Sequence, residues 1–247
     1  MAVIHDVTGS AYSIRTSSQV GFYTAIFTVL ITLVTFGFAI LAIPISGANC
    51  MEGCIQYPYL NTVGQFPRDY RWMPLAMVLV LSYLVLMICI HAYASPARKI
   101  FSQIGLSFAT LAALILLSDY FIQFSIVPIS LMSGETEGIT LLTQYNPHGV
   151  FIVLEELGYL LMSLSFLFAA PVFANKTRLT SSIRWIFILA FVLTVAAFTL
   201  VTFNRGLDRQ DSFEIMVISI DWLVLVINGI LLSIVFRRQL KESPAAL

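Results

Sequence analysis

The chain has 247 residues, of which 59% are hydrophobic and only 11% are charged. Soluble domains carry about 25% charged residues, so this composition excludes a soluble globular protein and indicates an integral membrane protein. The 13 basic and 13 acidic residues cancel to a formal charge of zero, which excludes a nucleic-acid-binding protein, because no overall basic field attracts a phosphate backbone.

Six apolar stretches are long enough to cross about 30 Å of hydrocarbon as helices. They cover residues 20–45, 72–94, 101–127, 150–173, 185–203 and 216–236. The stretches are continuous, whereas outer-membrane barrels have alternating strands of about ten residues. We therefore expect an all-α fold, a bundle of six transmembrane helices that forms a single domain over residues 1–247, with the lipid bilayer as its partner.

Basic residues in the connections predict the orientation. Nine lie on one side of the six spans and four on the other. Since basic residues accumulate on the cytoplasmic side, we expect a multi-pass protein of the cytoplasmic membrane with both termini in the cytoplasm. The cytoplasmic set is Arg15, Arg98, Lys99, Lys176, Arg178, Arg184, Arg237, Arg238 and Lys241. The outer set is Arg68, Arg71, Arg205 and Arg209.

The two long connections, residues 46–71 and 128–149, lie on the predicted outer side. Cys50 and Cys54 belong to the first of them, where an oxidising exterior permits a disulfide and Gly53 permits the turn that it needs. Both a bridge and free thiols stay open at this point. No histidine or further cysteine lies near enough in sequence to complete a tetrahedral set, so we predict no metal site, and the sequence names no cofactor.

Four acidic residues within the predicted spans are the candidate catalytic residues. An acid costs about 2.5 to 3.5 kcal/mol at the centre of a membrane helix on insertion scales, so each needs a partner or a function. At about 1.5 Å per residue, Glu155, Glu156 and Asp221 lie ~8 Å inside the outer ends of their helices and Asp119 lies ~12 Å inside. We predict that Asp119, Glu156 and Asp221 line one cavity in the outer half of the bundle.

Polar and aromatic neighbours accompany these acids. Glu155 points about 100° away from Glu156 around the helix axis, so we expect one of the two to pair with an outer arginine, for which Asp69 competes. The arginines considered are Arg68, Arg71 and Arg205. The alternative is that each acid only joins helices, protonated or paired. The candidate ligand-binding residues are Tyr120, Gln123, Tyr159, Trp222, Asn228 and His148.

The tripeptide Leu154-Glu155-Glu156 at the start of an apolar helix resembles the paired-glutamate motif of the membrane-bound carotenoid cyclases, which act on isoprenoid chains through acid-initiated chemistry. That motif usually has a proline before the pair and aromatic residues after it, whereas Val153 precedes the tripeptide and Leu157 follows it. The resemblance implies that Glu155 or Glu156 acts as an acid. The tract over residues 118–173 resembles small prokaryotic membrane proteins of uncharacterised function, which implies a cytoplasmic-membrane location.

Three functions compete on this basis. The first is a carboxylate-lined pocket that binds, and in an enzyme acts on, a small amphipathic or lipid-like molecule. The second is a transporter coupled to protons or cations, which needs polar groups that continue to the inner side. The third is an accessory subunit of a membrane complex, which should expose its acids on an outer helix face. The first is our prediction, and the oligomeric state stays open.

Overall fold

The computed structural model describes residues 2–42, 45–174 and 177–242. Over these ranges the chain is helical and forms no strand. Its α-helices are α1 (Ala2–Ile40), α2 (Trp72–Tyr93), α3 (Lys99–Ser125), α4 (Val127–Met132), α5 (Ile139–Leu142), α6 (Val150–Ala169), α7 (Arg178–Arg205) and α8 (Ser212–Glu242). Short 3-10 turns are η1 (Val63–Gln65), η2 (Arg68–Tyr70), η3 (Pro96–Arg98) and η4 (Ala170–Phe173).

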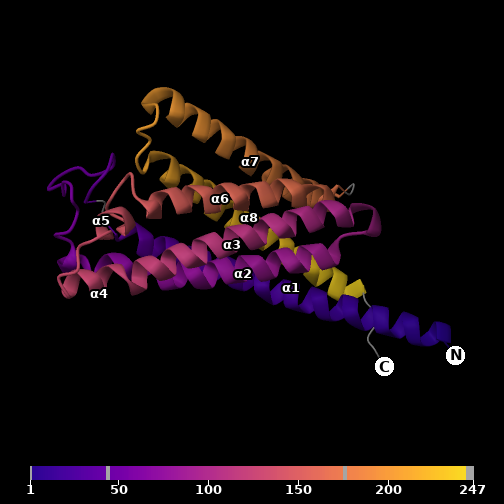
Figure 1. Cartoon of the computed structure of the whole chain (residues 1–247). Helices are drawn as coiled ribbons and strands as arrows, with labels where there is room; N and C mark the ends of the chain where they lie inside the picture. Colours follow the sequence, from indigo (N-terminus) through magenta and orange to yellow (C-terminus); the bar gives the residue numbers. More distant parts are fainter. Residues whose placement is uncertain (1, 43–44, 175–176, 243–247) are drawn as a thin grey trace.

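Six helices in the described ranges, α1, α2, α3, α6, α7 and α8, are long and apolar enough to cross a membrane. The predicted all-α, six-span bundle is thereby confirmed. α3 packs along α6, α1 packs against both α2 and α8, and α7 packs against α6 and α8. Figure 1 shows the start of α1 and the end of α8 at one end of the bundle, which we call the terminus end. The opposite end holds α4, α5 and the long connections, and we call it the loop end.

The first helix differs most from its prediction. α1 begins at Ala2 and continues without a break to Ile40, whereas the sequence predicts a span over residues 20–45. Residues 2–19 lack proline, so nothing in their backbone interrupts the helix that the apolar stretch propagates. Residues 43–44 of the predicted span and Lys176 of the predicted cytoplasmic set lie outside the described residues.

The remaining helix ends follow from local chemistry. Pro96 ends α2, because a residue before proline avoids the helical region and Ser95 is extended. Pro171 similarly stands where α6 gives way to η4. Thr177 caps α7 by accepting a hydrogen bond from the amide of Thr180 at 3.2 Å. Gly206 ends α7 with φ at 64°, a left-handed value that glycine adopts at little cost.

The half of the bundle at the terminus end is joined by close packing. The rings of Phe166 and Phe187 stack at 5.1 Å between centroids, and those of Tyr93 and Phe173 stack at 5.9 Å. Gly105 of α3 lies so near α6 that a Cβ placed on it would be 3.0 Å from the carbonyl oxygen of Ser165. α3 and α6 therefore approach each other backbone to backbone at this point.

Candidate functional site

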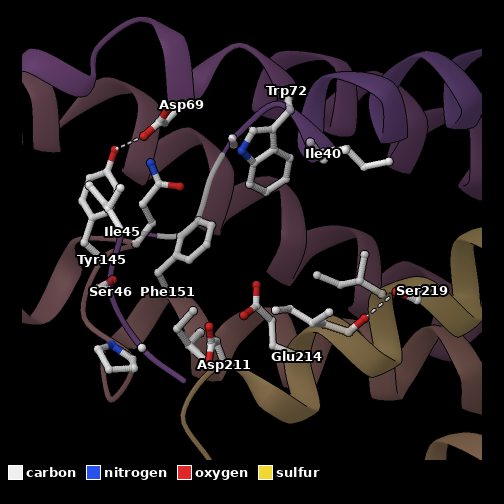
Figure 2. A pocket seen from close by; sticks show the side chains of 18 of the residues that line it. Ile40, Ile45, Ser46, Asp69, Trp72, Tyr145, Phe151, Asp211, Glu214 and Ser219 are labelled. Atoms are coloured by element: carbon white, nitrogen blue, oxygen red, sulfur yellow. Dashed lines mark hydrogen bonds between the residues drawn. The ribbon is translucent and has the colours of Figure 1, made fainter. Parts of the chain in front are cut away.

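A cavity of about 340 Å³ lies at the loop end, where the end of α1 meets the starts of α2, α6 and α8. This volume is at the lower end of the range for small-molecule pockets, about 300 to 1,000 Å³. Its walls are mainly apolar and aromatic, and Figure 2 shows Trp72, Phe151 and Ile40 around it. Its acidic lining residues are Asp69, Asp211 and Glu214.

Asp69, on η2 just before α2, is buried and held on two sides. The guanidinium of Arg68 donates to its carboxylate at 2.6 Å, and the hydroxyl of Tyr145 donates to it at 3.2 Å. Burial raises the pKa of Tyr145 well above its ordinary value, so that its hydroxyl stays protonated as a donor. Figure 2 shows this Tyr145–Asp69 bond at one side of the cavity.

Asp211, directly before α8, fixes the segment that follows α1. Its carboxylate accepts a hydrogen bond from the backbone amide of Ala48 at 3.0 Å. Gly47 has φ at 74°, and a Cβ there would lie 2.9 Å from an Asp211 carboxylate oxygen. Only glycine fits both the backbone conformation and the close approach, so Asp211 is a positioning residue for the cavity wall.

Glu214 of α8 faces the cavity and also reaches the buried Glu155 of α6. Figure 2 shows its carboxyl group directed toward the side of the cavity that Trp72 and Phe151 form. The Glu214 and Glu155 carboxyl groups lie close enough for a hydrogen bond between them. Since a carboxylate only accepts, such a bond requires a proton on one of the two carboxyl groups.

Behind Glu155 runs a chain of aromatic donors. The hydroxyl of Tyr120 donates to Glu155 Oε1 at 2.6 Å, and the hydroxyls of Tyr120 and Tyr159 lie 2.9 Å apart. The indole of Trp222 donates to the Tyr159 hydroxyl at 3.0 Å. Because Tyr120 gives its proton to Glu155, Tyr159 must donate to Tyr120. All three bonds are thus directed from Trp222 toward Glu155.

The remaining carboxyl groups of the membrane spans occupy separate places. Asp119 lies close enough to Glu155 for their charges to interact, and its Oδ2 is buried without a hydrogen-bond partner among the described residues. Asp221 is fully buried near Tyr83 and Tyr159, and both of its carboxylate oxygens lack a hydrogen-bond partner within the described ranges.

Glu156 does not line the cavity and pairs with Arg209. The guanidinium of Arg209 donates to its carboxylate at 2.9 Å and lies 5.1 Å from the ring centre of Phe198. The sequence predicts an arginine partner for one of the paired glutamates but considers Arg68, Arg71 and Arg205. Arg68 binds Asp69 instead, and the partner of Glu156 is Arg209, from the connection between α7 and α8.

The other predicted ligand-binding residues are dispersed. Gln123 donates to the Tyr70 hydroxyl at 3.5 Å, and Asn228 donates to the carbonyl of Ile183 at 3.4 Å, deeper in the bundle. His148 is exposed and lies 3.5 Å from the exposed Asp208. Of the ten predicted site residues, all of which the structure describes, only Trp222 lines the cavity.

The three acids predicted to share one cavity, Asp119, Glu156 and Asp221, do not line the cavity at this end. Sequence reasoning missed Glu214, although a signal existed. Glu214 precedes Asp221 by seven residues, as Asp221 precedes Asn228, so all three share one face of a helix.

The connection after α1 contains a disulfide between Cys50 and Cys54, whose Cα atoms lie 5.9 Å apart. Of the two states that the sequence leaves open, the structure has the bridged one. Among the described residues, no group of three or more His, Cys, Asp and Glu side chains is arranged to hold a metal ion.

No protein-family model, no curated protein and no solved structure matches the chain.

Proposed function

We propose that this polytopic membrane protein binds a small amphipathic molecule in the cavity at the loop end. The observation that carries the proposal is the composition of the cavity wall, where aromatic and aliphatic side chains surround a few carboxyl groups. Pockets of this kind bind the apolar body of a ligand through burial and fix its polar end through the few polar groups.

The apolar side of the cavity supports a ligand that enters from the membrane. Phe36 and Ile40 of α1 and Ile215 of α8 line the cavity and are exposed. An alkyl chain can therefore lie between the ends of α1 and α8 while its polar end reaches Glu214. The apolar part of such a ligand would thus contact apolar side chains, and its polar part would contact a carboxyl group.

Transport of the same ligand is the second candidate function, because acidic and polar groups continue inward from the cavity. Glu214, Asp221 and Asn228 follow one face of α8 at intervals of seven residues, or about 10.5 Å of helix per interval.

An accessory subunit is less well supported. The four acids predicted as candidates have exposed fractions of only 0 to 7% and offer little surface to a partner chain.

Binding can be tested with three probes that share a ten-carbon chain: decanol, decylamine and decanoate. Each is titrated into the protein in phosphatidylcholine nanodiscs by calorimetry, with empty nanodiscs as the blank. We expect saturable binding of at least one probe, and at least tenfold weaker binding to Ser219→Phe, because Ser219 lines the cavity. Ser233→Phe on the same helix is the matched control. Absence of saturable binding for all three probes overturns the proposal.

We also propose that the loop end faces outward and both termini face the cytoplasm, as the distribution of basic residues supports. A single reactive cysteine in place of Arg178, in a variant without the native cysteines, tests this orientation. We expect a membrane-impermeant maleimide to label it in inverted vesicles and not in intact cells. Labelling from the outside of intact cells contradicts the proposed orientation.

A further inference from the structure

The cavity carries negative charge without a compensating cation in its lining. Asp69, Asp211 and Glu214 line it, and no lysine, arginine or histidine among the described residues does. Asp69 has the outward-lying Arg68 as its partner, and Asp211 is engaged by a backbone amide. Glu214 is the acid whose partner is another acid. An aromatic wall beside such a carboxylate suits a cationic nitrogen, which is attracted to the faces of indole and phenyl rings.

The proton between Glu155 and Glu214 has a defined place. Oε1 of Glu155 accepts from the Tyr120 hydroxyl, at the end of the chain that begins at Trp222. Oε2 of Glu155 is buried and accepts from no N–H or hydroxyl donor among the described residues. The directed donors favour an ionised Glu155, so the shared proton belongs to Glu214, on the cavity side.

The elements that pack around Glu214 bring several charged groups close to it. α6 supplies Glu155 and Glu156, the latter neutralised by Arg209, and the connection before α8 supplies Asp211. The end of α1, residues 36–40, contains no titratable side chain. A cation that enters the cavity therefore meets several acids and no competing base, and its charge favours loss of the proton from Glu214.

We infer that the cavity takes an amphiphile with an ammonium group, and that this cation displaces one proton from the Glu155–Glu214 pair. The inference rests on the proposed function and names its ligand class. The exchange balances: the ammonium enters as a monocation, the Glu214 O–H bond breaks, and the proton passes to water. The pair then carries two negative charges, with the ammonium beside them.

The test uses decyltrimethylammonium, whose charge is fixed and which has no proton of its own to lose. Calorimetric titration at pH 7 in phosphate and in Tris gives the number of protons released, because the two buffers have different ionisation heats. We expect the wild-type protein in nanodiscs to release about one proton per cation bound and to bind the cation at least tenfold more tightly than decanol. Decanol should release none.

Two variants separate the effect of the Glu214 charge on binding from the release of a proton. Glu155→Gln keeps the Glu214 carboxylate and supplies an amide donor to it, so it should bind decyltrimethylammonium but release no proton. Glu214→Gln should bind it at least tenfold more weakly and also release none. Glu135→Gln, in an exposed connection at the same end, is the control and should behave as the wild type.

The outcomes distinguish this inference from the proposed function. If decanol binds in a manner sensitive to Ser219→Phe while the cation binds no more tightly, the pocket stands and the cationic ligand class is overturned. If the cation binds tightly but the wild type releases no proton, or if Glu155→Gln still releases one, the exchange is overturned. If no probe binds, both proposals fail.

Discussion

The two halves of the bundle use polar residues in opposite ways. At the terminus end, Arg98 donates to the backbone carbonyls of Val172 and Ala174, and stacked aromatic rings fill the space between the helices. At the loop end, acids and tyrosines from different helices bind one another. The first half keeps the helices together, whereas the second holds groups that can exchange a ligand or a proton.

This difference predicts which substitutions affect the fold and which affect the cavity. Close packing tolerates no added volume, because backbone atoms cannot move aside. A buried polar network instead tolerates replacement when the partner groups stay satisfied.

Gly105→Leu should have the largest effect. Its side chain would enter the contact with the Ser165 carbonyl oxygen and the Ala169 amide nitrogen, forcing α3 from α6 and lowering the free energy of unfolding by about 3 kcal/mol. Thermal unfolding followed by circular dichroism in detergent measures it. Gly37→Leu in α1 is the control, since no atom lies within 4 Å of its added Cβ. Equal stability of the two variants would contradict backbone packing of α3 on α6.

Arg209→Ala should destabilise the loop end by about 2 kcal/mol, because it leaves the buried Glu156 carboxylate without its partner. Adding Glu156→Gln should recover part of that loss, since the amide carries no charge. Unfolding of the single and double variants in the same detergent measures the coupling. A double variant that is less stable than Arg209→Ala would show that loss of the ion pair is not the reason for the lower stability.

Tyr120→Phe should lower stability by about 1.5 kcal/mol, because Glu155 loses a donor and Tyr159 loses its acceptor in a buried place. Tyr83→Phe, deeper in the bundle, should have the smaller effect. Ser165, its partner, keeps a hydrogen bond to the carbonyl of Met162. Unfolding of the two variants in the same detergent measures the difference. Equal stability of Tyr120→Phe and Tyr83→Phe would contradict the chain of donors.

His148→Ala should change stability by less than about 0.5 kcal/mol, as exposed substitutions usually do. Binding of the decyl probes should also be unchanged, since His148 does not line the cavity. This variant sharpens the limits of the site at the loop end. Probe binding weakened tenfold would place His148 in the site after all.

The sequence predicted the six spans because each is apolar over a length that only a membrane requires. It could not predict the rotation of each helix about its axis. Helices that are apolar on nearly every face carry little amphipathic signal to orient them, so the sequence could not show that Asp119, Glu156 and Asp221 lie outside the lining of the cavity.

The cavity was missed for a related reason. Asp69, Asp211 and Glu214 lie just outside the predicted spans. Acidic residues are common there, so nothing in the sequence distinguishes these three. Only the folding of the connections places them together, and connection geometry depends on contacts distant in sequence, such as Tyr145 with Asp69. Tyr120, Tyr159 and Trp222 were selected as neighbours of the acids, and the structure brings all three together beside Glu155.

The placement of the tryptophans gives the cavity its own optical reporter. The chain has three tryptophans; Trp72 and Trp222 line the cavity, while Trp185 is exposed on α7. A Trp185→Phe variant therefore emits only from the two indoles at the cavity. Its fluorescence spectrum should respond when a decyl probe replaces water beside these rings, so occupancy can be followed in time without an attached dye.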